Sequence, residues 1–200
     1  MVRPQPPQKQ RKETDMNKIL WFDLETTGLD PVTNDPIQIA GMVEVEGEIM
    51  EEFNILCKPF DMDSVSDEAL EVNKRTRADI EGFQEAAEAK QELDGILNNH
   101  IDKFNRNDKF YPGGYNVKFD IDFLAQWFRK HRDNYLGSYW NWRSIDPMPF
   151  LNVMAYKGEL DLPNLKLETV CEHFGIKLDA HDALSDVKAT RELVYKLNIL

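Results

Sequence analysis

The sequence predicts an α/β fold in which a mixed β-sheet is flanked by helices. Short apolar segments with strand character alternate along the chain with longer segments whose apolar residues recur at helical spacing. The 200 residues fit one domain, and an apolar content of 42% is enough for a hydrophobic core. No apolar run approaches the ~20 residues that a membrane helix requires, so we expect no membrane partner.

The composition also limits the cellular compartment and the binding partners that we expect. Two cysteines are too few for a disulfide framework or a zinc site, so we expect a reducing, cytoplasmic setting and buried Cys57 and Cys171 side chains. The net charge of −12 excludes recognition of DNA through a broad basic surface, because Lys and Arg supply most of the affinity for phosphate. It leaves open a nucleic-acid enzyme whose acidic residues hold metal ions.

The segment 1–15 is expected to be a disordered N-terminal tail. It holds three of the ten prolines, almost nothing apolar and a net charge of +2. We favour a passive tail over one that grips nucleic acid. A single domain is then expected over residues 16–200.

Three strands are expected first. The apolar run Lys18–Asp23 is typical of a buried strand. Residues 37–45 and 48–56 are predicted to be two strands joined at Glu46-Gly47, a pair suited to a tight hairpin turn. In the second of these strands, every other residue from Ile49 to Ile55 falls on one largely apolar face.

A run of helices follows the hairpin. Ser66 is predicted to cap a helix through Val72, because a serine side chain accepts a hydrogen bond from the first helical turn. A long amphipathic helix is expected over residues 83–104, with Lys90 as the one polar interruption of its apolar stripe. Residues 109–111 are then predicted to be another strand.

The second half of the chain repeats the alternation. A helix is predicted over residues 120–132 and a strand over residues 139–145. Pro147 suits the first turn of a helix that runs to Tyr156. A further helix is expected to end at Gly175, and the last one to span residues 183–197.

Two acidic side chains follow the first predicted strand. Asp23 and Glu25 are separated by one residue, so in a strand they project from the same face. Adjacent carboxylates repel each other unless a cation neutralises them, and oxygen ligands suit Mg²⁺ or Mn²⁺. The alternative is that the two acids mark a solvated strand end. The apolar run before them is expected to be buried, which disfavours this alternative.

Three more residues carry potential chemistry. Asp120 lies where a loop enters a helix, and by itself is as well explained as a helix cap. Asp186 lies on the first turns of the last helix, and His181 just before it. A histidine near neutrality can accept a proton from a water molecule. We assign ordinary structural roles to the other histidines, which are His100, His131 and His173.

Together these residues resemble the DEDDh 3′→5′ exonucleases, the relatives of the polymerase III epsilon proofreading subunit, RNase T and oligoribonuclease. Asp23-x-Glu25, Asp120 and His181-x4-Asp186 occur in the order of that family. The match extends over roughly residues 18–195. Accessory residues also agree with the family, namely Thr26, Thr27, Gly28, Asn116, Phe119, Ala189 and Thr190.

The resemblance implies an RNase H-like fold with a five-stranded mixed sheet and two divalent metal ions, Mg²⁺ or Mn²⁺. By resemblance, Asp23 binds both ions, Glu25 and Asp186 complete the site that activates water, and Asp120 supports the second ion. His181 is the general base. Cleavage would release a nucleoside 5′-monophosphate from the 3′ end. The residues implied to contact the terminal nucleotide are Leu24, Thr26, Thr27, Leu29, Asn116 and Phe119.

The resemblance also sets the expected partners, which are single-stranded DNA or RNA 3′ ends. DNA and RNA are both left open, as are a free-standing enzyme, a proofreading partner of a polymerase and a homodimer. A catalytically silent module that binds nucleic acid or a polymerase is the alternative. Many relatives have a His-Gly pair where this chain has Asn73-Lys74, and often a histidine in place of Tyr115, so substrate preference is in doubt.

Two further groups of side chains remain ambiguous. The basic cluster Lys74, Arg75 and Arg77 is either a phosphate contact or a solvated helix end. The tryptophans are expected to pack in the core rather than to stack on bases, in this strongly acidic chain. They are Trp127, Trp140 and Trp142.

Overall fold

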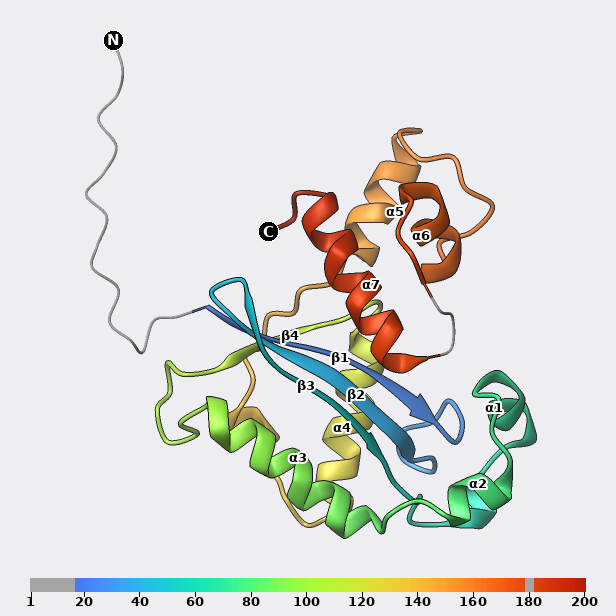
Figure 1. Ribbon diagram of the computed structural model, residues 1–200, viewed down its shortest axis with the longest axis vertical. Helices are drawn as coiled ribbons and strands as arrows, with labels where there is room; N and C mark the ends of the chain where they lie inside the picture. The colour runs from blue at the N-terminus through green and yellow to red at the C-terminus, as the bar shows by residue number, and fades with distance from the viewer. Residues whose placement is uncertain (1–16, 179–181) are drawn as a thin grey trace.

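A four-stranded mixed sheet forms the centre of the computed structural model, which describes residues 17–178 and 182–200 (Figure 1). The strand order is β3-β2-β1-β4, in which β1 is antiparallel to β2 and parallel to β4, and β2 is antiparallel to β3. The strands are β1 (Lys18–Thr26), β2 (Pro36–Val45), β3 (Glu48–Leu56) and β4 (Phe110–Gly113). The prediction of a mixed sheet with helices is therefore confirmed.

Seven α-helices and two short 3₁₀ helices are found among the described residues. No helix there has both the length and the apolar character needed to cross a membrane. The α-helices are α1 (Asp67–Val72), α2 (Arg77–Glu81), α3 (Ala86–His100), α4 (Lys118–Lys130), α5 (Met148–Tyr156), α6 (Leu167–Phe174) and α7 (Ala183–Lys196). The 3₁₀ helices are η2 (Met62–Ser64) and η3 (Leu136–Ser138).

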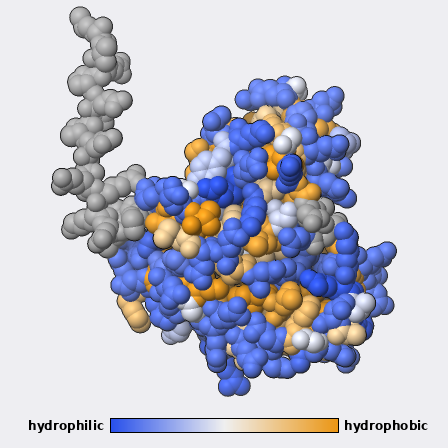
Figure 2. Space-filling model, in the orientation of Figure 1, coloured by the Kyte–Doolittle hydropathy of each residue, from blue (hydrophilic) through white to orange (hydrophobic). Residues whose placement is uncertain are grey.

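The alternation of side chains along β1 divides the core between the two faces of the sheet. Leu20 and Phe22 are buried in one cluster with residues of α3 and α4, whereas Trp21 is buried in another with Val187 and Val194 of α7. Figure 1 shows α7 and α3 on opposite sides of the strands. Figure 2 shows hydrophobic surface between β3 and α3 on an otherwise mainly hydrophilic face. The site residues of β1 therefore lie between packed layers.

Several elements begin or end where local signals in the sequence predict. Glu46 and Gly47 form the β2–β3 turn with φ of 50° and 90°, the left-handed conformations of a tight hairpin. The Ser66 side chain accepts the Ala69 N–H at 3.0 Å at the start of α1. Gly175 ends α6 with a φ of 65°. Cys57 and Cys171 are buried free thiols, as expected.

The prediction of a five-stranded sheet is wrong for the described residues. The segment 139–145 meets β4 only through two isolated parallel bridges, Phe110 with Trp140 and Gly113 with Ile145. Pro112 has no N–H to donate to a continuous ladder at this edge. Trp142 lies between the two bridges and is 86% exposed, so its expected core position is also wrong. Trp127 and Trp140 are buried as expected.

The long amphipathic helix is shorter than predicted. It begins at Ala86 and ends at His100, and Phe104 beyond it is 86% exposed. The segment that follows is rich in Asp and Asn, whose side chains accept hydrogen bonds from nearby backbone N–H groups and so compete with helix formation, as Asp102 does with the N–H of Phe104 at 3.1 Å. Lys90, the polar interruption, is buried and pairs with Asp94 at 2.6 Å and Asp133 at 3.0 Å.

Candidate active site

Four carboxylates from three elements are directed to the carboxyl end of β1. Asp23 and Glu25 belong to β1, Asp120 to the first turn of α4, and Asp186 to the first turn of α7. The Asp120 side chain accepts the Leu24 N–H at 3.1 Å, which joins α4 to β1 between the two β1 acids. Asp120 is thus a buried residue that contacts β1 rather than a cap of its own helix.

Burial and mutual repulsion raise the pKa values of these acids. Burial raises the pKa of Asp23 well above its usual range, and the charges of Asp120, Glu25 and Asp186 add to this. Burial and Asp186 raise the pKa of Glu25 to about 7, which Arg75 partly opposes. The shared interactions show that the four carboxylates form one electrostatic group.

Asp120 is shifted in the same direction. Burial raises its pKa to about 8, although the hydrogen bond from the Leu24 N–H acts in the opposite sense. The charges of Glu25 and Asp146 contribute further to the rise. Around neutral pH the group therefore holds protons or attracts a cation, since its full ionisation without either is unfavourable.

The chemistry of these donors fits a hard divalent cation. The four side chains offer only carboxylate oxygens, which Mg²⁺ and Mn²⁺ prefer over the nitrogen and sulfur ligands of zinc sites. Within residues 17–178 and 182–200, no three Asp, Glu, His or Cys side chains already form a metal-ligand cluster. The carboxylates would have to draw closer around a cation, which their repulsion opposes while no cation is present.

The start of α7 places Asp186 beside the sheet. Asp182 caps this helix by accepting the Ser185 N–H at 3.1 Å. Further along α7, the Arg191 Nε donates to the buried carboxylate of Glu44 in β2 at 2.6 Å, and Trp21 donates to the same oxygen at 2.9 Å. These bonds fix α7 on the sheet. His181, the expected general base, lies outside the described residues.

A groove of about 560 Å³ opens at the end of β1, where it is lined by Thr26, the residue that follows Glu25. It lies between the end of β1 with its following loop and α1. Thr26 and Leu29 line one wall, and Val72 and Asn73 line the other. Leu29 is 85% exposed, and the Asn73 side chain donates to the Thr26 carbonyl at 2.9 Å. The groove thus offers an apolar side chain to a ligand beside the acidic group.

The other expected substrate residues have different surroundings. Leu24 and Thr27 are buried, and the Thr27 Oγ1 accepts the Asp35 N–H at 3.0 Å, so neither side chain lines the groove. Asn116 is exposed with a φ of 55°, and Phe119 packs on Phe123 with ring centroids 4.7 Å apart. Of the six expected contacts, the groove brings together Thr26 and Leu29.

Asp146 is a site residue that the sequence analysis missed. Its carboxylate accepts the N–H groups of Asn116 at 3.1 Å, Val117 at 3.2 Å and Met148 at 2.9 Å. It therefore holds the turn that leads into α4 and Asp120. The available signal was the position of Asp146, directly before Pro147 at the start of a helix. Nothing in the sequence indicated which distant segment Asp146 would bind.

The basic cluster separates into cations with different roles. Arg77 donates to the carbonyls of Met62 at 3.0 Å and Val65 at 2.7 Å, so it holds the chain ahead of α1. Arg75 lies over the Phe83 ring at 5.7 Å, and its charge lowers the pKa of Glu25. Arg75 is consequently the member of the cluster that acts on the acidic group.

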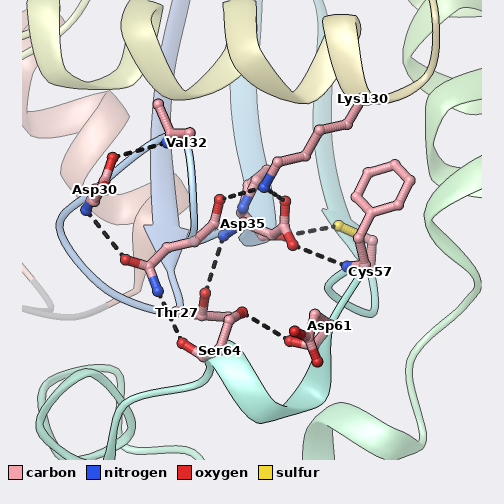
Figure 3. A network of polar contacts seen from close by, with 11 residues as sticks. Thr27, Asp30, Val32, Asp35, Cys57, Asp61, Ser64 and Lys130 are labelled. Atoms are coloured by element: carbon pink, nitrogen blue, oxygen red, sulfur yellow. Dashed lines mark hydrogen bonds and ion pairs between the residues drawn. The ribbon is translucent and has the colours of Figure 1, made fainter.

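A buried polar network holds the loop after β1 (Figure 3). Asp35, only 1% exposed, accepts hydrogen bonds from the Lys130 Nζ at 2.6 Å and the Phe60 N–H at 2.9 Å. Lys130 also donates to the Asn34 carbonyl at 2.9 Å. Thr27 donates its N–H to the Asp35 carbonyl at 2.9 Å. The groove loop, the segment after β3 and the end of α4 are thereby held together.

Lys130→Met should lower the free energy of unfolding by about 3–5 kcal/mol, because it leaves the buried Asp35 carboxylate without its cation. Urea denaturation in the presence of a chelator measures this decrease. Lys118→Met is the matched control on the same helix, since its exposed pair with Asp122 should contribute no more than about 0.5 kcal/mol. Equal decreases in the two variants would show that the Asp35–Lys130 pair does not hold the loop.

Comparison with protein families identifies a match over nearly the whole described chain. The model of the family RNase_T, described as exonuclease, matches residues 20–194. A DNA polymerase III of the PolC type from Thermotoga petrophila is 28% identical over 174 residues, which are 86% of this chain and 11% of the polymerase. The chain thus spans about a tenth of the length of this relative.

Solved structures show the same fold. E. coli Exonuclease I in complex with a dT13 oligonucleotide superposes with a TM-score of 0.72 at 21% identity, covering 90% of this chain and 40% of that one. The zinc-bound form of an E. coli Exonuclease I complex with single-stranded DNA gives a TM-score of 0.74 at 20% identity, covering 92% and 40%. At this level of identity the likeness establishes the architecture.

Proposed function

The chain belongs to the RNase_T family of exonucleases, and on this basis we propose that it is a metal-dependent 3′→5′ exonuclease acting on single-stranded nucleic acid. The observation that carries the proposal is the convergence of Asp23, Glu25, Asp120 and Asp186 at the end of β1. The products would be nucleoside 5′-monophosphates. The mixed sheet and the groove beside the carboxylates support the same assignment.

The four carboxylates would hold two divalent ions, Mg²⁺ or Mn²⁺. Such ions, when bound, stabilise the negative charge on the attacking and leaving oxygens of a phosphodiester. In the proposed mechanism the oxygen of a water molecule bonds to phosphorus while His181 accepts its proton. The bond between phosphorus and the 3′ oxygen breaks, and this oxygen takes a proton from solvent and leaves as a 3′ hydroxyl. Leu29 and Val72 would bracket the terminal nucleotide in the groove.

Single-stranded DNA is the first substrate to test. The two Exonuclease I structures described above are complexes with a dT13 oligonucleotide and with single-stranded DNA. The PolC-type relative is a polymerase, which supports a polymerase as a partner of this chain. Matched DNA and RNA oligomers, with free or blocked 3′ ends, should distinguish the substrates. We expect mononucleotides from free 3′ ends of DNA, whereas cutting of blocked ends would contradict exonuclease polarity.

A catalytically silent binding module is the second candidate function. The presence of all four carboxylates argues against it, because a binding module has no need for a group of repelling, half-buried or buried acids. A cleavage assay distinguishes the two functions. A silent module would bind the oligomer and leave it intact with Mg²⁺ or Mn²⁺ present, while the proposed enzyme should lose all cleavage in excess EDTA.

Metal ions should raise the thermal stability of the chain. A ligand that binds only the folded form at about 100 times its dissociation constant contributes about 2.7 kcal/mol, which for this size is about 5–10 °C in Tm. Differential scanning calorimetry with Mn²⁺ or EDTA measures the shift. K⁺ at matched ionic strength is the control. A Tm that does not respond to Mn²⁺ would contradict a converged site.

The thermal stability of the chain should also depend on pH. The pKa values of Glu25 and Asp120 are raised to about 7 and about 8 in the folded chain, above ordinary values of about 4. The metal-free chain therefore loses stability as pH rises through these folded values. Because metal binding requires deprotonated carboxylates, the Mn²⁺-induced rise in Tm should be larger at about pH 8 than at about pH 5.5. Equal rises would show that these acids are not the ligands.

A further inference from the structure

A second groove, of about 470 Å³, lies where the α3–β4 connection meets the turn after α4. Lys103 and Phe104 come from the first segment, and Arg132, Tyr135 and Tyr139 from the second. The α3–β4 connection lies at the end of the sheet where β1 begins, because Asp108 in it pairs with Lys18 at 2.6 Å. The α3–β4 connection is thus at the opposite end of β1 from the carboxylates, whereas the end of α4, just before Arg132, is joined to the loop after β1 by the Lys130–Asp35 pair.

The groove exposes aromatic rings to solvent. Phe104 is 86% exposed and Tyr135 is 73% exposed, while Tyr139 is buried beneath them. The Lys103 Nζ lies 5.8 Å from the ring centroids of both Phe104 and Tyr139. The side chains thus combine accessible π faces with a nearby cation.

Two cations, Lys103 and Arg132, and one acid, Asp133, line the groove, although the chain is strongly acidic. Asp133 pairs with Lys90 at 3.0 Å, and Asp108 in the α3–β4 connection pairs with Lys18. The Asp102 carboxylate accepts the Phe104 N–H at 3.1 Å. Within the described part of the chain, Lys103 and Arg132 form no ion pair with an acidic group. Both cations are exposed. Their charge is therefore available to a ligand with anionic groups.

We propose that this groove binds single-stranded nucleic acid, with bases stacked on Phe104 and Tyr135 and phosphates bound by Lys103 and Arg132. Exposed aromatic rings beside cations are the general means of holding single strands, because every base has a π face and every nucleotide a negative charge. An acidic peptide would satisfy the cations alone. The two exposed rings favour the nucleic acid.

The distance between the groove and the carboxylates gives the groove a role in the proposed exonuclease function. This role depends on that function. Arg132 lies two residues beyond the end of α4, and this helix rises about 15 Å from Asp120 to Lys130. A dinucleotide in the active site cannot reach that far, whereas a longer strand can. The groove would hold the 5′ part of the substrate strand while its 3′ end is cleaved.

Binding can be tested without cleavage, by fluorescence anisotropy of labelled dT oligomers in EDTA. We expect Phe104→Ala/Tyr135→Ala to weaken binding of a long oligomer about tenfold or more. Lys103→Gln/Arg132→Gln should reduce the slope of log affinity against log salt by about 1.4, because each phosphate neutralised on a single strand contributes ~0.7. Tyr156→Ala/Lys157→Ala is the control, because Tyr156 is 93% exposed beside Lys157 at the end of α5, away from the groove.

Cleavage assays then separate this proposal from the proposed function. Both groove variants should raise KM for a long strand, leave kcat unchanged, and leave cleavage of a dinucleotide unchanged. Unaltered binding in both variants would overturn the groove while leaving the exonuclease intact. Weaker binding in the charge variant alone would also overturn it, in favour of a site for acidic polymers. If wild-type protein binds but never cleaves, the proposed function fails and the groove stands.

Discussion

Asp23→Ala should reduce cleavage by about 10³-fold or more, and by more than Glu25→Ala. Asp23 is the acid whose pKa responds to all three other carboxylates, so it occupies the centre of the group. A residue that contacts both proposed ions should affect the stabilisation of both oxygens, which amounts to several kcal/mol of the barrier. Single-turnover cleavage of a short DNA oligomer with saturating Mn²⁺ measures the two rates.

A second measurement separates a defect in chemistry from a defect in folding. Asp23→Asn removes one repelling charge and keeps the shape of the side chain, so without metal it should be at least as stable as the wild type. Asp122→Ala is a control on the surface of α4, where its exposed carboxylate pairs with Lys118. Equal residual rates in Asp23→Ala and Glu25→Ala would remove the central role of Asp23.

Local signals in the sequence placed the residues that carry this prediction on their elements, and the resemblance to the exonuclease family joined them into one site. The spacing of Asp23 and Glu25 determines that they share a face of β1, and the apolar run before them shows that the strand is buried. Asp120 and Asp186 lie in first helical turns, which the sequence pattern also indicates. Periodicity and capping were therefore enough to predict most of the fold.

Other features depend on contacts between distant segments and left no local signal. Asp35 and Lys130 are 95 residues apart in the sequence, and only the packing of α4 on the sheet joins them. Asp146 binds a turn 29 and 30 residues earlier. The missing fifth strand has the same origin, since the effect of Pro112 depends on which edge of β4 the later segment would pair with.

The second large effect is expected for His181→Ala, which should lower the cleavage rate by about 10²–10⁴-fold, the usual contribution of a positioned acid–base group. His181 directly precedes Asp182, the cap of α7, and lies five residues before Asp186 in the sequence. As a general base it must be neutral to accept a proton, so the wild-type rate should rise with pH through its pKa. His181→Asn should restore nothing, because an amide cannot take up the proton.

Metal titration distinguishes a base from a ligand at this position. Imidazole is not among the proposed ligands, so His181→Ala should bind Mn²⁺ nearly as the wild type does and show the same rise in Tm. Its pH–rate profile should lose the rising limb that the wild type shows, which a merely structural role would leave in place. A near-normal rate in His181→Ala would assign the proton to another group. Failure to bind Mn²⁺ would make His181 a ligand or a support of Asp186, and the mechanism would then require a different base.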